Sequence, residues 1–492
     1  MNIEQTEISQ VSNGSDTPSM KRFLRKFWPL FFVRAVVALS VAGLMLNMLG
    51  ISKIIWPYDP FHSVELGLIV GLKTISLAIM GLVFGFFADR FSRKYLLIFV
   101  LMIMGIGRFF NGFVPLYEFN TYLLFLLSYI VLGIGQGGVL PVIFSISNDT
   151  ISFKARSRFF GVIVFFFQLF VIFGMLLSSV LIQAGLWRIY YWTTGILLFI
   201  GGILMLFFKE PKRGLMYEEL AYILTTQYEK DGIKFETKYD YKLTKETIRT
   251  TIFSPTNIIA FIEGISTWIL FSIAIYMIYP YIQSPPKNVS PVVSSLLMII
   301  FGLPGSIFGS IAFSKLSDRL AAKDIKNRIY LIAFSMGSLF FLILVIFILP
   351  LPTLLPWEGN YIENILKYPV FFLFGGLLFI LRAIIVIYAV NQNPVLQKIN
   401  LPEAQATISS WNQFLEFIGF GLGPIISGVL LSLNNYNYMS TAFISISLGI
   451  PSILLWLVAT KWLHKDIDRV NSILKQRASE ISSKIENNKK NT

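Results

Sequence analysis

Long apolar runs recur along the whole chain, and shorter polar segments separate them. About 20 consecutive apolar residues are enough for an α-helix to cross a lipid bilayer. The runs of suitable length are residues 27–49, 64–86, 95–116, 121–146, 158–182, 189–208, 255–282, 291–313, 329–350, 369–392, 407–432 and 438–463. The pattern therefore predicts an all-α membrane protein with twelve transmembrane helices.

One polar segment divides these predicted helices into two groups of six, and two more flank them at the ends of the chain. Residues 1–26 are rich in Ser, Asn, Gln and Glu, and we expect them to form a disordered tail. Residues 209–254 carry nine Lys or Arg and eight Asp or Glu, and they include an amphipathic stretch at 217–226 that is typical of a helix on the membrane surface. The predicted domains are the N-terminal tail, a six-helix bundle over 27–208, a linker over 209–254, a second bundle over 255–464 and a C-terminal tail over 465–492.

A cluster of charges after the second apolar run is repeated after the eighth. Residues 85–94 read GFFADRFSRK, and residues 314–319 read SKLSDR. Charged groups this dense are too costly to bury in hydrocarbon, so both segments are expected to be tight turns at the membrane surface. Asp318 follows Asp89 by 229 residues, which is about half the chain. The repetition predicts two pseudo-symmetric six-helix bundles.

The distribution of basic residues predicts the orientation of the chain. Of 41 Lys and Arg, the loops expected to face outward contain Lys53, Arg188, Lys287 and Lys367, whereas most others lie on the tails and on the loops of the other side. Cytoplasmic loops are enriched in Lys and Arg, so both termini are expected to be cytoplasmic in a multi-pass protein of the cell membrane. The net charge of +14 then needs no nucleic-acid partner; the lipid bilayer is the expected partner of these basic loops.

The composition argues against several other classes of protein. Hydrophobic residues make up 55% of the chain and charged residues 14%, unlike a soluble domain. There is no cysteine, and the two histidines, His62 and His464, lie at predicted helix ends. This set of residues cannot form a Ser-His-Asp triad, a Cys-ligated metal site or a His-rich metal site. We therefore expect no enzyme activity, no metal and no cofactor.

Several short motifs resemble one known family. The turn at 85–94 resembles the loop between helices 2 and 3 of the major facilitator superfamily, G-x-L-A-D-R-x-G-R-K, with Phe87 replacing Leu and Ser92 replacing Gly. The fourth run, through Pro141, resembles the family pattern R-x-x-x-G-x-G-x-x-x-x-x-P, except that Tyr129 replaces the arginine. The segment EPKRG at 210–214 is similar to the Spinster-like branch.

The resemblance implies a fold and a mechanism. It covers about residues 27–464 and implies a secondary transporter of a small organic solute that works by rocker-switch alternating access. The family's arginine in the fourth helix has been linked to proton coupling, and Arg382 occupies the corresponding place in the second half. The turns are implied to gate one side of the membrane through Gly85, Asp89, Arg90, Arg93, Asp318 and Arg319.

Polar side chains inside the predicted spans are the candidates for substrate binding or coupling. Intramembrane charges are costly and often functional, although pairing for structure alone is equally common. The candidates are Arg34, Lys73, Gln136, Glu263, Arg382 and Glu416. We expect Arg34 to meet Glu263 across the centre and Glu416 to reach Lys73, whereas Arg108 is expected to be structural.

The charge balance of these candidates favours an anionic substrate. The candidates include two acids, Glu263 and Glu416, and three basic residues, Arg34, Lys73 and Arg382. If each acid pairs with a basic residue, one positive charge is left over for a carboxylate or phosphate, such as that of an amphipathic anion. A neutral solute such as a sugar remains an alternative, carried by a uniporter. A channel or a non-transporting sensor on the same scaffold is another. A coupling proton or cation is a further expected partner, and we expect a monomer.

The repeated turns lead to a first prediction. If Asp89 and Asp318 hold the cytoplasmic side closed, then Asp89→Asn should slow transport while leaving expression and substrate binding intact. Uptake and binding, measured in parallel on the single and double Asn variants, check this. Unchanged uptake in both single variants would count against a latch.

Overall fold

The computed structural model describes residues 20–59, 62–88, 90–116, 120–150, 153–210, 244, 248 and 252–490. Asp89, the amphipathic stretch at 217–226 and most of the predicted tail at 1–26 lie outside the described residues. Within the described part, twelve helices are long and apolar enough to cross a membrane. This confirms the number of spans predicted from the apolar runs.

The first six spans form one half of the molecule. The first span is interrupted near Asn47, whose side-chain amide donates to the Ser178 hydroxyl (2.8 Å) on the fifth span. The helices of this half are α2 (Met20–Val41), α3 (Gly43–Leu46), α4 (Met48–Ile55), α5 (Ser63–Ala88), α6 (Arg93–Asn111), α7 (Thr121–Thr150), α8 (Phe153–Gln183) and α9 (Trp187–Leu206).

The last six spans form the second half. Several of its helices begin with proline, which fits the first turn of a helix because its missing N–H has no partner there anyway. They are α12 (Pro255–Gln283), α13 (Pro291–Leu297), the π-helical turn η3 (Met298–Gly302), α14 (Leu303–Ala321), α15 (Lys326–Ile348), the short turn η4 (Glu358–Asn360), α16 (Ile362–Leu366), α17 (Pro369–Lys398), α18 (Pro402–Leu433) and α19 (Tyr438–Lys490).

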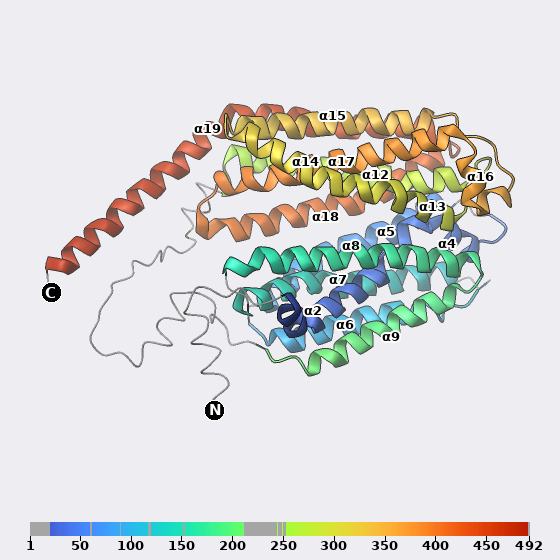
Figure 1. The fold of residues 1–492 in the computed structure, drawn as a ribbon, viewed down its shortest axis with the longest axis horizontal. Helices are drawn as coiled ribbons and strands as arrows, with labels where there is room; N and C mark the ends of the chain where they lie inside the picture. Colours follow the sequence, from blue (N-terminus) through green and yellow to red (C-terminus); the bar gives the residue numbers. More distant parts are fainter. Residues whose placement is uncertain are drawn as a thin grey trace.

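The two halves lie side by side, and the described chain begins in α2 and finishes in α19 toward the same end of the bundle (Figure 1). We call this the terminal end and the other the opposite end. The architecture is the predicted pair of six-helix bundles. Helix α19 extends well beyond the bundle at the terminal end, so the last span and the segment after it form one continuous helix (Figure 1).

Glycines bring the halves into backbone contact along α5 and α18. A Cβ atom added to Gly67 would lie 2.4 Å from the Pro424 carbonyl oxygen, and one added to Gly71 would lie 2.6 Å from the Gly421 carbonyl oxygen. Small residues at such positions let two membrane helices approach closely. Both contacts lie in the parts of α5 and α18 that are nearer the opposite end.

Hydrogen bonds reinforce this contact at the opposite end. The Tyr276 hydroxyl of α12 donates to the Ser63 carbonyl oxygen at the start of α5 (2.6 Å). The Ser179 and Ser295 hydroxyls join α8 to α13 (2.8 Å), and the Gln283 amide donates to the Leu46 carbonyl oxygen (2.9 Å). The structure is therefore closed between its halves at the opposite end.

At the terminal end, Glu210 caps the N-terminus of α6. Its carboxylate accepts hydrogen bonds from the Arg93 backbone N–H (2.8 Å), from the Arg93 side chain (3.1 Å) and from the Ser92 hydroxyl. A carboxylate is favourable here because the helix dipole is positive at this end. Partial burial acts to raise the pKa of Glu210, but the hydrogen bonds from Ser92 and Arg93 outweigh it and bring the pKa below its ordinary value.

The second half has its own ties at the terminal end. Asp318 forms an ion pair with Arg328 (2.8 Å), and Arg328 also donates to the Asn391 side chain (3.3 Å) on α17. Asp466, near the end of the last span, accepts from the backbone N–H (3.1 Å) and hydroxyl (2.6 Å) of Thr256 at the start of α12. Each half is thus braced within itself at this end.

The Glu210 cap leads to a stability prediction. Glu210→Ala should lower the free energy of unfolding by about 0.5–2 kcal/mol at neutral pH, because it removes the cap of α6. A lowered pKa in the folded state means that this contribution is complete above the ordinary glutamate pKa of about 4.3 and disappears as the pH falls through the folded value. Thermal unfolding of wild type and variant in detergent, from pH 7 to about pH 3, measures the difference.

Glu363→Ala is the matched control, because Glu363 is an exposed acid in the short helix α16 at the opposite end. It should unfold like wild type at every pH. A Glu210→Ala variant whose deficit stays constant as the pH falls would contradict the cap.

Candidate functional site

The charged side chains inside the spans are distributed unequally between the halves. Arg34, Lys73 and Arg108 lie in the first half, and Glu263 and Glu416 lie in the second half together with Arg382. Among the described residues, the ion pairs found include none of these six side chains. The expected pairs Arg34–Glu263 and Lys73–Glu416 are therefore not formed in this structure.

Arg108 lies in a cage of tyrosines at the centre of the first half. Its side chain is fully buried, and its guanidinium carbon lies 5.3 Å, 5.1 Å and 4.9 Å from the ring centres of Tyr129, Tyr190 and Tyr191. One nitrogen donates to the Ser40 carbonyl oxygen of α2, and the other two have no partner in the described part of the chain. Aromatic faces stabilise a cation in a low-dielectric interior, so the cage partly compensates for the absent acid.

The cage joins four spans. Arg108 is on α6, Tyr129 on α7, and Tyr190 and Tyr191 are on α9; the Tyr190 hydroxyl also donates to the Leu39 carbonyl oxygen of α2 (2.8 Å). The hydroxyls of Tyr129 and Tyr191 are 3.1 Å apart. Tyr129, which replaces the arginine of the family pattern, is therefore one wall of a site that holds an arginine from a neighbouring helix.

Lys73 lies close to this cage. The Lys73 backbone packs against Gly133 of α7, one turn from Tyr129 of the cage: a Cβ added to Gly133 would lie 2.1 Å from the Lys73 carbonyl oxygen. The Lys73 side chain is half-buried. Two positive charges thus occupy one region of the first half.

The other candidates, two arginines and a glutamine, have weak partners or none among the described residues. The Arg34 guanidinium lies 3.7 Å from the centre of the Phe167 ring on α8, and its Nε is buried without a hydrogen bond to a described residue. Arg382 approaches the Met298 sulfur (3.7 Å) in the π-helical turn. Gln136, on α7, is half-buried and its side-chain oxygen has no described partner.

Glu263 is a buried acid of the second half. It is fully buried on α12 and accepts hydrogen bonds from the Thr267 hydroxyl, one turn along, and from the Tyr388 hydroxyl of α17 (3.1 Å). The Tyr388 ring lies edge-on to Trp268, with ring centres 6.5 Å apart. Hydroxyl donors therefore hold this acid in place of a cation.

Glu416 lies near Glu263, on α18. It accepts a hydrogen bond from the Asn412 amide (2.7 Å), and Asn412 in turn accepts one from Gln392 of α17 (3.5 Å). A Cβ added to Gly264, the residue after Glu263, would lie 3.4 Å from the Glu416 side chain, so the two acids are on adjoining parts of α12 and α18. The second half thus contains a pair of acids within a network of hydroxyl and amide donors.

The turn residues predicted to gate are at the terminal end. Arg93 is buried and bound to Glu210, whereas Arg90 is exposed and lies over the Phe86 ring (3.3 Å). A Cβ on Gly85 would just touch Pro141 of α7 (3.9 Å), so this glycine lies beside α7. Asp318 pairs with Arg328, while Arg319 is exposed; Asp89 lies outside the described residues.

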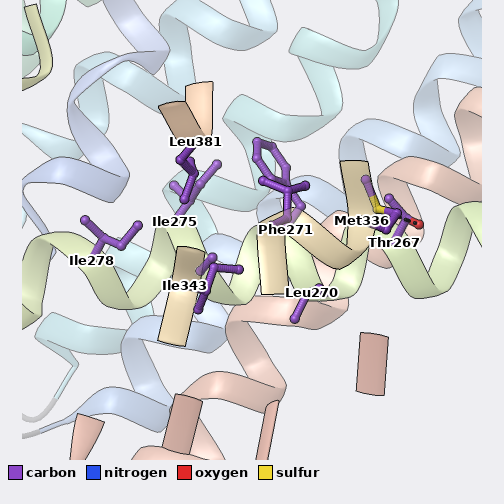
Figure 2. A pocket seen from close by; sticks show the side chains of 10 residues that line it. Thr267, Leu270, Phe271, Ile275, Ile278, Met336, Ile343 and Leu381 are labelled. Atoms are coloured by element: carbon purple, nitrogen blue, oxygen red, sulfur yellow. Dashed lines mark hydrogen bonds between the residues drawn. The ribbon is translucent and has the colours of Figure 1, made fainter. Parts of the chain in front are cut away.

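A small cavity lies between α12, α15 and α17 of the second half (Figure 2). Its volume is about 10 Å³, and apart from Thr267 its lining is apolar, with Phe271, Met336 and Leu381 among the side chains that face it. A water molecule needs at least this volume and several polar partners, so the cavity is a dry packing defect. It is too small for a substrate.

Comparison with known proteins gives a family match over most of the chain. The Major Facilitator Superfamily model matches residues 30–424. The Bacillibactin exporter of Bacillus subtilis (strain 168) is 29% identical over 124 residues, which cover 24% of this chain and 30% of that protein. The match therefore spans less than a third of the exporter.

Two solved structures show the same fold at low sequence identity. A bacterial homolog of the human lysosomal transporter Spinster, in an inward-facing and unoccupied conformation, has a TM-score of 0.65 at 16% identity, covering 90% of this chain and 98% of that one. A D-xylose-proton symporter has a TM-score of 0.59 at 15% identity, covering 87% of this chain and 96% of that one.

Sequence reasoning missed several residues of this region. Arg108 was expected at the periphery, but it is fully buried among Tyr129, Tyr190 and Tyr191. Tyr388 and Thr267 were not candidates as partners of Glu263. Thr267 could have been found from its spacing, because it lies four residues after Glu263 on the same helix.

The cage of Arg108 leads to a prediction about stability. Arg108→Lys keeps the charge but loses the planar group that faces three tyrosine rings and the Ser40 carbonyl, so the variant should lose about 1–3 kcal/mol of unfolding free energy. Thermal unfolding in detergent measures the loss. Arg188→Lys is the matched control: Arg188 stacks on Trp187 (4.6 Å) near the end of a span, and the loss there should be smaller. Equal losses would contradict the cage.

Proposed function

The chain belongs to the major facilitator superfamily, and we propose on this basis that it is a secondary transporter that carries a small organic anion by alternating access. The observation that carries the proposal is the excess of positive charge inside the first half. Arg34, Lys73 and Arg108 lie there without an ion pair to any described residue. An uncompensated charge in the bilayer is costly, and a substrate carboxylate or phosphate would compensate it.

The contacts between the halves support alternating access. The glycine contacts of α5 with α18, and the hydrogen bonds of Ser63, Ser179 and Gln283, close the opposite end. Each half is braced internally, by the Arg108 cage in one and by the Glu263 network in the other. Opening the opposite end then requires two rigid bundles to separate there and meet at the terminal end.

The acids of the second half are the proposed coupling site. Glu263 is buried and Glu416 is half-buried on the adjacent helix, and their described partners are hydroxyl and amide donors, with no cation among them. A carboxyl in such a place can exchange a proton when the access of the site changes sides. Coupling to protons occurs on this fold, as the D-xylose-proton symporter shows by its name.

In the proposed orientation the protein lies in the plasma membrane and both termini are cytoplasmic. The terminal end carries Arg90, Arg93, Lys94 and Lys326, and the opposite-end loops carry few basic residues. This asymmetry is the one that membrane insertion favours. In this orientation the structure is closed toward the outside, and the proposed latch residues Asp89, Arg90, Asp318 and Arg319 lie on the cytoplasmic side.

Transport assays in proteoliposomes test this function. The purified protein should take up members of a panel of organic anions, and an imposed pH gradient should change the initial rate. Saturable uptake of neutral sugars without any response to the gradient would favour the neutral uniporter instead. Currents that do not saturate with solute concentration would favour a channel.

The charge hypothesis makes a separate prediction about binding. Lys73→Gln and Arg382→Gln should each weaken binding of the anionic ligand by about tenfold or more, because a hydrogen bond to a charged group is worth about 1.5–3 kcal/mol. Binding of its neutral analogue should change little. Titration calorimetry on both ligands measures the ratio, with Lys53→Gln, at the opposite-end surface, as the control. Equal losses for both ligands would refute the anion hypothesis.

A further inference from the structure

A second hollow lies at the opposite end of the second half, away from the charged residues of the spans. It has a volume of about 440 Å³, within the usual range for a small-molecule site. Three separate segments build it: the end of α12 with the turn after it, the end of α15, and the turn between α18 and α19. Its lining residues are Tyr281, Ser284, Pro285, Lys287, Phe347, Tyr436, Asn437, Tyr438 and Met439.

The aromatic wall of this hollow is fixed in place. The Tyr281 hydroxyl donates to the Phe347 carbonyl oxygen (3.2 Å), and the Tyr281 ring lies edge-on to Phe347 and Tyr438, with ring centres 4.9 Å and 5.6 Å away. Tyrosines at span ends commonly direct their hydroxyls into the membrane surface. Here the Tyr281 hydroxyl is directed into the protein instead, so the ring serves as a wall.

The turn that carries Lys287 is also held firmly. The Asn288 amide donates to the Leu354 carbonyl oxygen (2.7 Å), and the Leu354 N–H donates to the Pro286 carbonyl oxygen (2.9 Å). An added Cβ on Gly359 would lie 1.9 Å from the Asn288 carbonyl oxygen, so the two loops are in backbone contact. The position of Lys287 is therefore set before any ligand arrives.

Lys287 is a half-buried cation without an acid. Its ammonium lies 3.9 Å from the centre of the Tyr281 ring, and the ion pairs among the described residues do not include it. Burial lowers the pKa of Lys287 below its ordinary value, which is the cost of holding the charge there. An anion in the hollow would remove that cost.

The remaining polar groups of the hollow are mainly donors. The Asn437 side-chain oxygen accepts from the Ser440 N–H (3.0 Å), and its amide N–H groups have no acceptor among the described residues. The Ser284 and Tyr438 hydroxyls are 3.3 Å apart and share one hydrogen bond, so one O–H proton is left over. An ammonium, an amide and a hydroxyl together suit a group with three acceptor oxygens.

We propose that this hollow binds a small organic phosphate, with the phosphate at Lys287 and Asn437 and the organic part against Tyr281 and Tyr438. The phosphate is either that of a free solute or the headgroup of an anionic phospholipid in the adjacent leaflet. The site is separate from the proposed transport pathway, because Tyr281 lies near the end of α12, about 27 Å along this helix from Glu263.

The test uses the full-length protein in detergent with three probes. They are glycerol 3-phosphate, dioctanoyl phosphatidylglycerol and, as a zwitterionic lipid of equal chain length, dioctanoyl phosphatidylcholine. The temperature of unfolding should rise with the concentration of an anionic probe, glycerol 3-phosphate or phosphatidylglycerol, because a ligand that binds the folded state stabilises it. A rise with both anionic probes indicates a free-solute site, and a rise with phosphatidylglycerol alone indicates a lipid headgroup site.

Variants then assign the effect to the hollow. Lys287→Gln should raise the half-maximal probe concentration by about tenfold or more, and Lys287→Arg should largely preserve it. Asn437→Asp keeps the acceptor for Ser440 and adds a repelling charge, so it should weaken binding similarly even if Lys287→Gln fails to fold. Lys367→Gln, an exposed lysine on a nearby loop, is the control and should behave as wild type. The proposal fails if no anionic probe raises the unfolding temperature, if phosphatidylcholine acts equally, or if Asn437→Asp responds as wild type does.

Discussion

The cost of a charged group inside a bilayer is the constraint on which the rest of this structure depends. Each charged side chain in the spans must be compensated within reach of its own helix or lie where a ligand can compensate it. The chain meets the constraint inside each half separately. Arg108 has three tyrosine rings, and Glu263 has the hydroxyls of Thr267 and Tyr388.

These two arrangements lie one in each half and hold charges of opposite sign. The Arg108 cage involves spans 1, 3, 4 and 6, and the Glu263 network begins on span 7 and reaches span 10, the counterparts of spans 1 and 4. Each half therefore retains its polar interior when the halves move apart, because neither charge depends on a partner in the other half. The interface itself is then free to use glycine backbone contacts and hydroxyl hydrogen bonds, which can be broken without exposing an unpaired charge.

The sequence was sufficient for the spans because the signal is local: an apolar run of about 20 residues has few alternatives. The repeated turns also gave the division into halves. Partners of individual charges were harder to predict, since they depend on how helices rotate against one another. Asp318 was expected to act with its neighbour Arg319, but it pairs with Arg328, ten residues on, because the turn brings the start of α15 back beside the end of α14.

Arg108 shows the same limit more clearly. Its helix was expected at the periphery, and nothing in the local sequence marks Tyr129, Tyr190 and Tyr191 as its neighbours. Glu210 was recognised only as part of a branch-like motif, whereas its role as a helix cap depends on the end of α9 returning to the turn before α6. The roles in substrate binding or coupling stay predictions for all six candidates, Arg34, Lys73, Gln136, Glu263, Arg382 and Glu416.

The glycine contacts between α5 and α18 have a consequence for the membrane as an electrical insulator. Where Gly67 meets the Pro424 carbonyl, backbone lies against backbone with too little space for even one methyl group. A continuous file of water molecules, the usual path by which protons leak through a protein, has no room along this contact. This contact therefore offers no path for a proton leak, and the membrane stays insulating along it.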